Sequence, residues 1–260
     1  MWTDDTAMTI AVAEALIDSI DDTEDQFRRI LIHNLHRWGN KYPNAGYGRR
    51  FLQWILDWET QPYGSWGNGS AMRVSPVGWM FDTIEETEKI AGITAAVTHD
   101  HPEGIKGAQA VAVAIFLARN GKGKEEIRDA IEKRYGYDLS MTDDFIKTSD
   151  RHTVSCQRTV PEAICAFLNG NSFVDVIKRA VSYGGDTDTI AAISGSIAEA
   201  YYDIPKKLIL ECEERLPDDM LYVLRAFQAH KLRRVYHAKP KGTGTEPDVA
   251  EEQDGGEGYA

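Results

Sequence analysis

The chain of 260 residues has few cysteines, and none of them form a recognisable disulfide or metal motif. Cys156, Cys165 and Cys212 lie far apart, contain no CxxC pair and leave an odd count. This spacing gives no disulfide framework and suggests no zinc site, so a reducing, cytoplasmic setting is expected.

Basic charge is also scarce. Lys and Arg number 29 against 41 Asp and Glu, which gives a formal net charge of -12. Nucleic acids and anionic membranes bind basic surfaces, so neither partner is indicated. The N-terminus has no basic segment followed by an apolar one, and no stretch approaches the roughly 18 to 20 apolar residues that cross a bilayer. Neither export nor a membrane span is expected.

Strand patterns are missing as well, because no stretch shows a period-2 alternation rich in Val, Ile and Thr. Apolar residues recur at helical spacing along the chain instead. We therefore expect an all-α fold, a compact multi-helix bundle formed by a single domain over residues 1–237. The segment 238–260, rich in Gly, Pro and acidic residues, is expected to be a disordered acidic tail. The predicted helices are 4–19, 23–38, 48–58, 70–80, 83–97, 104–120, 123–135, 159–169, 172–182, 186–202, 205–214 and 217–236.

Two of these helices are rich in small residues and apolar nearly all round, which is typical of central helices packed on every side. They are "GIKGAQAVAVAIFLARN", over 104–120, and "DTDTIAAISGSIAEAYY", over 186–202.

Two acidic clusters stand at helix starts: Thr3-Asp4-Asp5-Thr6, and Asp186-Thr187-Asp188-Thr189 after two glycines. Asp and Thr are favoured N-caps, so each cluster alone is explained by capping and by the helix dipole. A cap needs only one side chain, however, and neighbouring carboxylates repel each other unless a cation gathers them. The recurrence of the cluster favours a shared metal site.

The ligands in these clusters are oxygen atoms only, which favours Mg²⁺, with Mn²⁺ or Ca²⁺ as alternatives. The second cluster lacks the central Gly and closing Glu of an EF-hand loop. Four aspartates carry enough charge for two divalent ions, which could orient sugar hydroxyls and polarise a water.

Two further stretches suggest ligand contacts. "YGSWGNGSAM" has glycines ahead of a predicted helix, which suits phosphate, although it fits neither the Walker nor the GxGxxG spacing and can also be an ordinary turn. In "VTHDHPEG", His99 and His101 have no third nitrogen or sulfur ligand beside them, so capping and packing roles are favoured over metal binding. His99 could instead hydrogen-bond a polar ligand. "NKYPNAGYGRRF" is interpreted as a loop before a basic helix start.

Four motifs together resemble the ADP-ribosylglycohydrolase family in order and spacing. They are "TDDTAMTIAVAEAL", "YGSWGNGSAMRVSPVGW", "THDHPEGIKGAQAVAVAIF" and "GGDTDTIAAISGSIAEAYY", and the resemblance extends from about residue 2 to residue 205. It implies an all-α orthogonal bundle with a binuclear Mg²⁺ centre. The implied activity is hydrolysis of the glycosidic bond between ADP-ribose and a protein side chain or another acceptor.

The resemblance also implies roles for individual residues. The implied metal ligands are Thr3, Asp4, Asp5, Asp186, Asp188 and Thr189. The implied substrate-binding residues are Gly64, Ser65, Trp66, Gly67, Asn68 and His99, with the glycine-rich stretch at the diphosphate. Asp4 or Asp5 is then the carboxylate that activates a water against the anomeric carbon of the ribose.

The chain departs from the family pattern at its front. Family members carry a further GxxxGDxxG-like helix, with an acidic residue used near the metal or the leaving group, whereas only Met1 and Trp2 precede Thr3 here. A start codon assigned too late, a natural truncation and a substitute acid elsewhere in the chain are the three explanations. The truncated case gives the alternative function, an ADP-ribose or nucleotide-binding module without turnover. A helical interaction protein whose acidic clusters are only caps is the third possibility.

Overall fold

The fold is built from helices. A computed structural model describes the chain except for residues 1, 21, 150–153 and 239–260. Among the described residues the only β pairing is an isolated bridge between Gly67 and Ser155. The helices are α1 (Asp4–Asp18), α2 (Glu24–Lys41), α3 (Arg49–Leu56), α4 (Gly69–Met72), α5 (Ser75–Met80), α6 (Ile84–Ala96), α7 (Pro102–Arg119), α8 (Lys124–Tyr135), α9 (Asp143–Thr148), α10 (Cys156–Asn169), α11 (Phe173–Ser182), α12 (Thr187–Tyr201), α13 (Lys206–Glu213) and α14 (Asp218–Ala238). The predicted all-α multi-helix bundle is confirmed.

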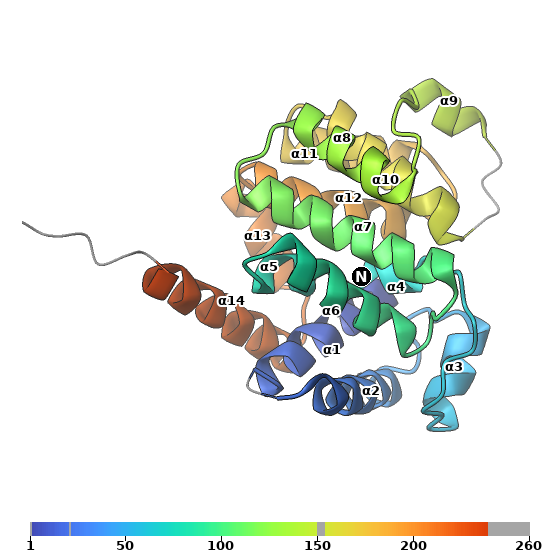
Figure 1. The fold of residues 1–260 in the computed structure, drawn as a ribbon, viewed down its shortest axis with the longest axis vertical. Coiled ribbons are helices and arrows are strands. Elements are labelled where there is room, and N and C mark those ends of the chain that lie inside the picture. Colours follow the sequence, from blue (N-terminus) through green and yellow to red (C-terminus); the bar gives the residue numbers. More distant parts are fainter. Residues whose placement is uncertain (1, 21, 150–153, 239–260) are drawn as a thin grey trace, which may run out of the picture.

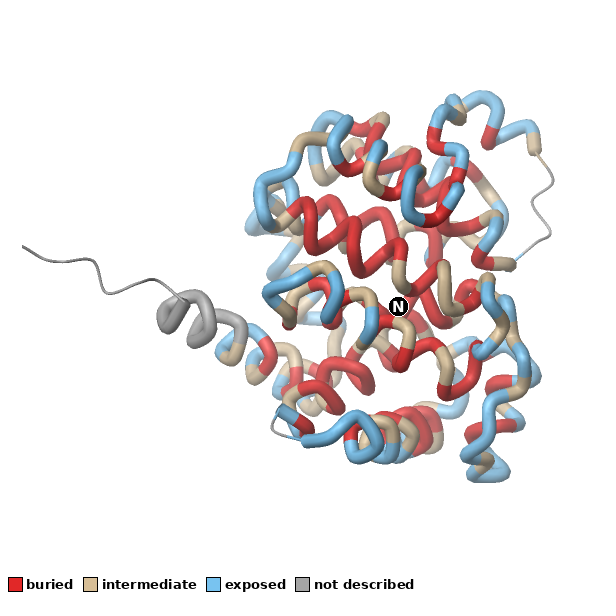
Figure 2. The backbone as a smooth tube through the Cα atoms, viewed as in Figure 1, coloured by how far each residue is buried: buried red, intermediate tan, exposed pale blue. Residues whose placement is uncertain are grey.

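Helix α7 forms the centre of the bundle, as its composition predicts. It is buried over most of its length and packs against α4, α5, α6, α8, α10 and α12 (Figure 1). Burial is continuous from Ala110 to Ala118, whereas outer helices such as α2 and α8 alternate between buried and exposed residues (Figure 2). Helix α12 differs from the expectation, because Glu199 and Tyr201 near its end are exposed. It packs on α7, α10 and α11.

The structure corrects the predicted elements at two places. The range 70–80 is two short helices, α4 and α5, separated at Arg73 and Val74. Pro76 explains the break, since proline lacks the N–H that would continue the hydrogen-bond ladder but fits the first turn of a new helix. The short helix α9 was not predicted at all.

Helix α4 and the starts of three other helices position the candidate site. The four-residue α4 contacts α1, α7, α10 and α12, and it lies near the middle of the molecule (Figure 1). The loop before α4 is tied to the start of α10: the Asn68 N–H donates to the Val154 carbonyl at 2.8 Å, and the Cys156 N–H donates to the Trp66 carbonyl at 2.9 Å. The N-termini of α1 and α12 approach the same region.

The predicted acidic tail over 238–260 lies outside the described residues apart from Ala238. In the part of the chain that is described, none of the helices combines the length and the apolar character that a membrane span requires.

Candidate functional site

A cavity of about 350 Å³ lies between the starts of α1 and α12, the glycine-rich loop and the start of α3. This is a usual size for a small-molecule site. The cavity brings together eight of the predicted site residues: Asp4, Ser65, Gly67, Asn68, His99, Asp186, Asp188 and Thr189. Gly64 and Trp66 line an adjoining cavity of about 570 Å³, and the two cavities share Ser65 and Gly67. Thr3 and Asp5 lie outside the cavity lining.

The N-cap residues of the two acidic clusters do not cap their helices. Thr3 and Asp186 occupy the N-cap positions of α1 and α12, yet neither side chain accepts a hydrogen bond from the helix backbone. By contrast, the hydroxyls of Thr23 and Thr83 cap α2 and α6 in the usual way. Thr3 and Asp186 are therefore not explained as simple N-caps.

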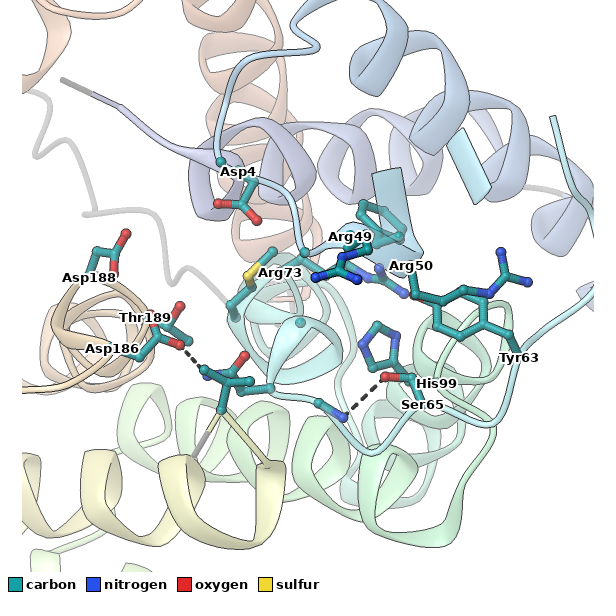
Figure 3. A pocket seen from close by; sticks show the side chains of 18 residues that line it. Asp4, Arg49, Arg50, Tyr63, Ser65, Arg73, His99, Asp186, Asp188 and Thr189 are labelled. Carbon is teal, nitrogen blue, oxygen red and sulfur yellow. Dashed lines mark hydrogen bonds between the residues drawn. The ribbon is translucent and has the colours of Figure 1, made fainter. Parts of the chain in front are cut away.

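The cluster side chains bond to one another and to the glycine-rich loop instead. The Thr3 hydroxyl donates to Asp5 Oδ2 at 2.9 Å, and Asn68 Nδ2 donates to Asp186 Oδ2 at 2.6 Å. The Thr189 hydroxyl is close enough to lower the pKa of both carboxyl groups by hydrogen bonding. Residues about 180 positions apart therefore meet at one end of the cavity (Figure 3).

The surroundings of the carboxyl groups at this end of the cavity disfavour their ionised form. Burial, together with the neighbouring aspartates, raises the pKa of Asp4 to about 6 and that of Asp5 to about 7. Burial also raises the pKa of Asp186. Asp5 Oδ1 is buried and has no hydrogen-bond partner. Buried carboxylates normally have a cation or donors around them, so this oxygen set suits a divalent cation.

The described side chains are not arranged as a complete set of metal ligands. Across the described ranges, no three side chains of His, Cys, Asp or Glu converge closely enough to hold an ion as they stand. The metal site therefore remains a prediction, supported by the oxygen-only donors, the orphaned Asp5 oxygen and the raised pKa values.

The raised pKa of Asp5 predicts how stability depends on pH when divalent ions are chelated. An acid whose pKa is higher in the folded state holds its proton more tightly there, so the free energy of unfolding falls as pH rises from about 4 to about 7. The difference between 3.8 and about 7 corresponds to roughly 4 kcal/mol. The Asp5→Asn variant should therefore melt several degrees above wild type at pH 8 and close to it at pH 4.

Thermal melts in EDTA across this pH range test the prediction. Asp25→Asn is the matched control, because Asp25 also lies in the first turn of a helix but is exposed. Equal melting temperatures for wild type and Asp5→Asn at pH 8 would contradict it.

The opposite end of the cavity is cationic. It is lined by Arg49, Arg50 and Arg73, beside His99 and Tyr63 (Figure 3). Arg50 is bound to Glu59 through two 2.7 Å hydrogen bonds, whereas Arg49 is exposed at the start of α3. The sequence pattern indicates the basic helix start but not its place in the site, and it does not point to Arg73. The glycines of "NAGYGRR" were the sequence signal that could have placed the basic helix start in the site, since they let this loop run along the cavity wall.

The glycine-rich loop is fixed by its own hydrogen bonds. Gly64 N–H donates to Asp100 Oδ1 at 2.6 Å, and Gly67 N–H donates to Ser65 Oγ at 3.2 Å. Since Asn68 N–H is also bonded, these three backbone donors are occupied in the described structure. The assignment of the loop to a diphosphate therefore stays a prediction.

The two histidines have separate roles. His101 Nδ1 accepts a hydrogen bond from Glu103 N–H at 3.1 Å and so caps α7, which confirms the capping role for this residue. Its ring also packs edge-on against Trp66, which is otherwise exposed. His99 is buried and lines the cavity.

Comparison with known proteins places the chain in a family. A sequence model of the ADP-ribosylglycohydrolase family matches residues 1–238. Human ADP-ribosylhydrolase ARH3 is 27% identical over 90% of this chain and 79% of its own length. The ADP-ribosylarginine hydrolase Tri1 of Pseudomonas putida is 25% identical over 78% of this chain and 59% of its own length.

A solved structure shows the same fold. One chain of an ADP-ribosylglycohydrolase-related protein complex superposes with a TM-score of 0.62, covering 89% of this chain and 79% of that one at 24% identity. From the family match over nearly the whole described length, we conclude that the chain belongs to the ADP-ribosylglycohydrolase family.

Proposed function

We propose that the chain is a Mg²⁺-dependent hydrolase that releases ADP-ribose from an ADP-ribosylated acceptor, such as a protein side chain. Family membership gives the reaction class, cleavage of a glycosidic linkage to ADP-ribose. The observation that carries the proposal is the polarity of the cavity, with carboxylates at one end and arginines at the other (Figure 3). ADP-ribose has the matching polarity, since its distal ribose presents hydroxyls and its diphosphate carries negative charge.

The acidic end would bind the distal ribose together with the ions. Thr3, Asp4, Asp5, Asp186, Asp188 and Thr189 would hold Mg²⁺, with Mn²⁺ as the alternative. Mg²⁺ bound there would supply Lewis-acid chemistry, ordering ribose hydroxyls and lowering the pKa of a water. Asn68 would keep Asp186 in position through its 2.6 Å hydrogen bond.

The cationic end would bind the diphosphate. Arg49 offers an exposed guanidinium, and His99 and Ser65 line the same wall. Arginine is well suited to phosphate oxygens because its planar fork can donate two hydrogen bonds at once. Trp66, more than half exposed in the adjoining cavity, offers a flat apolar face for the base.

Asp4 is the better placed of the two predicted catalytic carboxylates. It lines the cavity, whereas Asp5 lies behind it and is bonded to Thr3. In hydrolysis a water oxygen bonds to the anomeric carbon, the bond from that carbon to the acceptor breaks, and the acceptor leaves with a proton from solvent. Asp4 would accept the proton that the water loses, because its carboxylate lines the cavity where the ribose would lie.

The assay that tests this proposal measures release of free ADP-ribose from a protein modified on arginine or on serine. It is run beside isothermal titration with ADP-ribose, both in Mg²⁺. We expect release from at least one substrate together with binding of ADP-ribose. Binding without release from either substrate would establish the non-catalytic alternative. If the protein shows no binding and no release, the proposal is contradicted and the acidic clusters have no ADP-ribose ligand.

A further inference from the structure

A buried arginine forms part of the cationic wall of the cavity. Arg73 is 1% exposed, and among the described residues no ion pair to it is present. Its Nη2 donates to the Thr94 carbonyl at 2.9 Å and to Thr98 Oγ1 at 2.8 Å. A buried charge that meets neutral acceptors and the Phe51 ring, 5.7 Å away, in place of a carboxylate is costly, which suggests that its position serves something other than stability.

The Thr98 hydroxyl continues the chain of hydrogen bonds to His99. Thr98 Oγ1 lies 2.7 Å from His99 Nδ1. Because Arg73 can only donate, the threonine oxygen accepts from it and keeps its own proton for a further acceptor. His99 Nδ1 is the acceptor within reach, and a hydrogen bond donated to it would leave the ring proton on Nε2.

The buried imidazole of His99 carries a single ring proton near pH 7. Burial, reinforced by the positive charge of Arg73, lowers the pKa of His99 well below its usual value, so the imidazole is neutral near pH 7. In a neutral ring one nitrogen donates and the other accepts. The hydrogen bond at Nδ1 therefore decides what Nε2 can offer.

The Nε2 edge of the ring faces the glycine-rich loop. A Cβ at Gly69 would lie 3.1 Å from His99 Nε2, and one at Gly67 would lie 3.7 Å from it. The first distance is too short to be comfortable, so a side chain at position 69 would crowd this edge. The two glycines leave Nε2 beside the cavity wall, where it can meet a ligand.

We propose that Arg73 and Thr98 are positioning residues that fix the Nε2–H tautomer of His99, so that a neutral imidazole presents a hydrogen-bond donor to an anionic ligand. The assignment of that ligand rests on the proposed function, in which the diphosphate of ADP-ribose lies at this wall. Phosphate oxygens only accept hydrogen bonds. The other tautomer would turn a lone pair toward them and weaken binding.

The first arm of the test needs no ligand. Protein labelled with ¹⁵N-histidine is studied by NMR near pH 7, and the His99 signals are identified by their loss in a His99→Gln variant. We expect Nδ1 to show the shift of an unprotonated nitrogen and Nε2 that of a protonated one. A protonated Nδ1 in the wild-type protein would overturn the proposal, whatever the protein binds.

The second arm compares Thr98→Val, which keeps the shape of the side chain, with Thr98→Ser, which keeps the hydroxyl. We expect Thr98→Val to mix the two tautomers and to weaken ADP-ribose binding about tenfold, and Thr98→Ser to stay within about twofold of wild type. A purely structural role would lower the melting temperature of Thr98→Val but leave its tautomer unchanged, and that result would overturn the proposal.

The two arms separate this inference from the proposed function. If wild type shows the Nε2–H tautomer and Thr98→Val loses it, but wild type binds no ADP-ribose, the positioning role of Arg73 and Thr98 is supported and the proposed function is wrong. If wild type binds ADP-ribose and Thr98→Val binds it equally well with the same tautomer, the positioning role is wrong and the proposed function is supported.

Discussion

Replacing Asp4 with alanine is expected to lower the turnover number for ADP-ribose release by about 10² to 10⁴, because the variant loses the carboxylate that faces the cavity. Asp4 would act both on the attacking water and on the bound ions, so its loss should reduce turnover more than it weakens ADP-ribose binding. Steady-state kinetics at saturating Mg²⁺, with calorimetry for binding, separate these two effects.

Asp25→Ala is the matched control for this substitution. Asp25 and Asp4 both occupy the first turn of a helix, so both variants lose the same favourable interaction with the helix dipole. Asp25 is exposed and belongs to α2, outside the cavity, so its variant should keep wild-type turnover. Equal turnover for Asp4→Ala and Asp25→Ala would mean that Asp4 serves only as a helix-start residue.

Removal of divalent cations should have an equally large effect. With EDTA the aspartates around Thr189 lose the charge that gathers them, and release of ADP-ribose should fall to the background of an enzyme-free reaction. Mg²⁺ should restore it, and Mn²⁺ should restore at least part of it, because both are hard cations that accept carboxylate oxygens. Ca²⁺ prefers more ligands at longer distances and should restore less.

Binding to the folded protein alone should also raise its melting temperature, since an ion that prefers the native state stabilises it. The rise should be larger at pH 8 than at pH 5, because Asp4 and Asp5, with pKa values of about 6 and 7, hold protons at the lower pH. Turnover that is unchanged in EDTA, with no rise in melting temperature on adding Mg²⁺, would contradict a cation-dependent site.

The sequence was sufficient to predict most of the helices and the meeting of the acidic clusters. Apolar periodicity located α7, and the repeated Asp and Thr pattern pointed to Asp4 and Asp186 although they are distant in the chain. Periodicity could not place the break between α4 and α5. There the chemistry of Pro76 overrides a continuous apolar pattern.

The residues of the cationic wall were harder to predict. Arg73 lies among apolar residues and bonds to a backbone carbonyl and a hydroxyl, and such partners leave no charge pattern in the sequence. Thr98 is likewise an ordinary residue at the end of a helix until its hydroxyl is placed between Arg73 and His99. Both roles depend on tertiary contacts, which spacing along the chain does not encode.

The central claim is that two helix starts about 180 residues apart form one cation site for ADP-ribose. Anomalous diffraction from crystals grown with Mn²⁺ and ADP-ribose tests it most directly. We predict manganese within ligand distance of carboxylates from both clusters, Asp4 or Asp5 on one side and Asp186 or Asp188 on the other, with the distal ribose beside the metal. Manganese bound to one cluster alone, or absent from the cavity while ADP-ribose is bound there, would contradict the account.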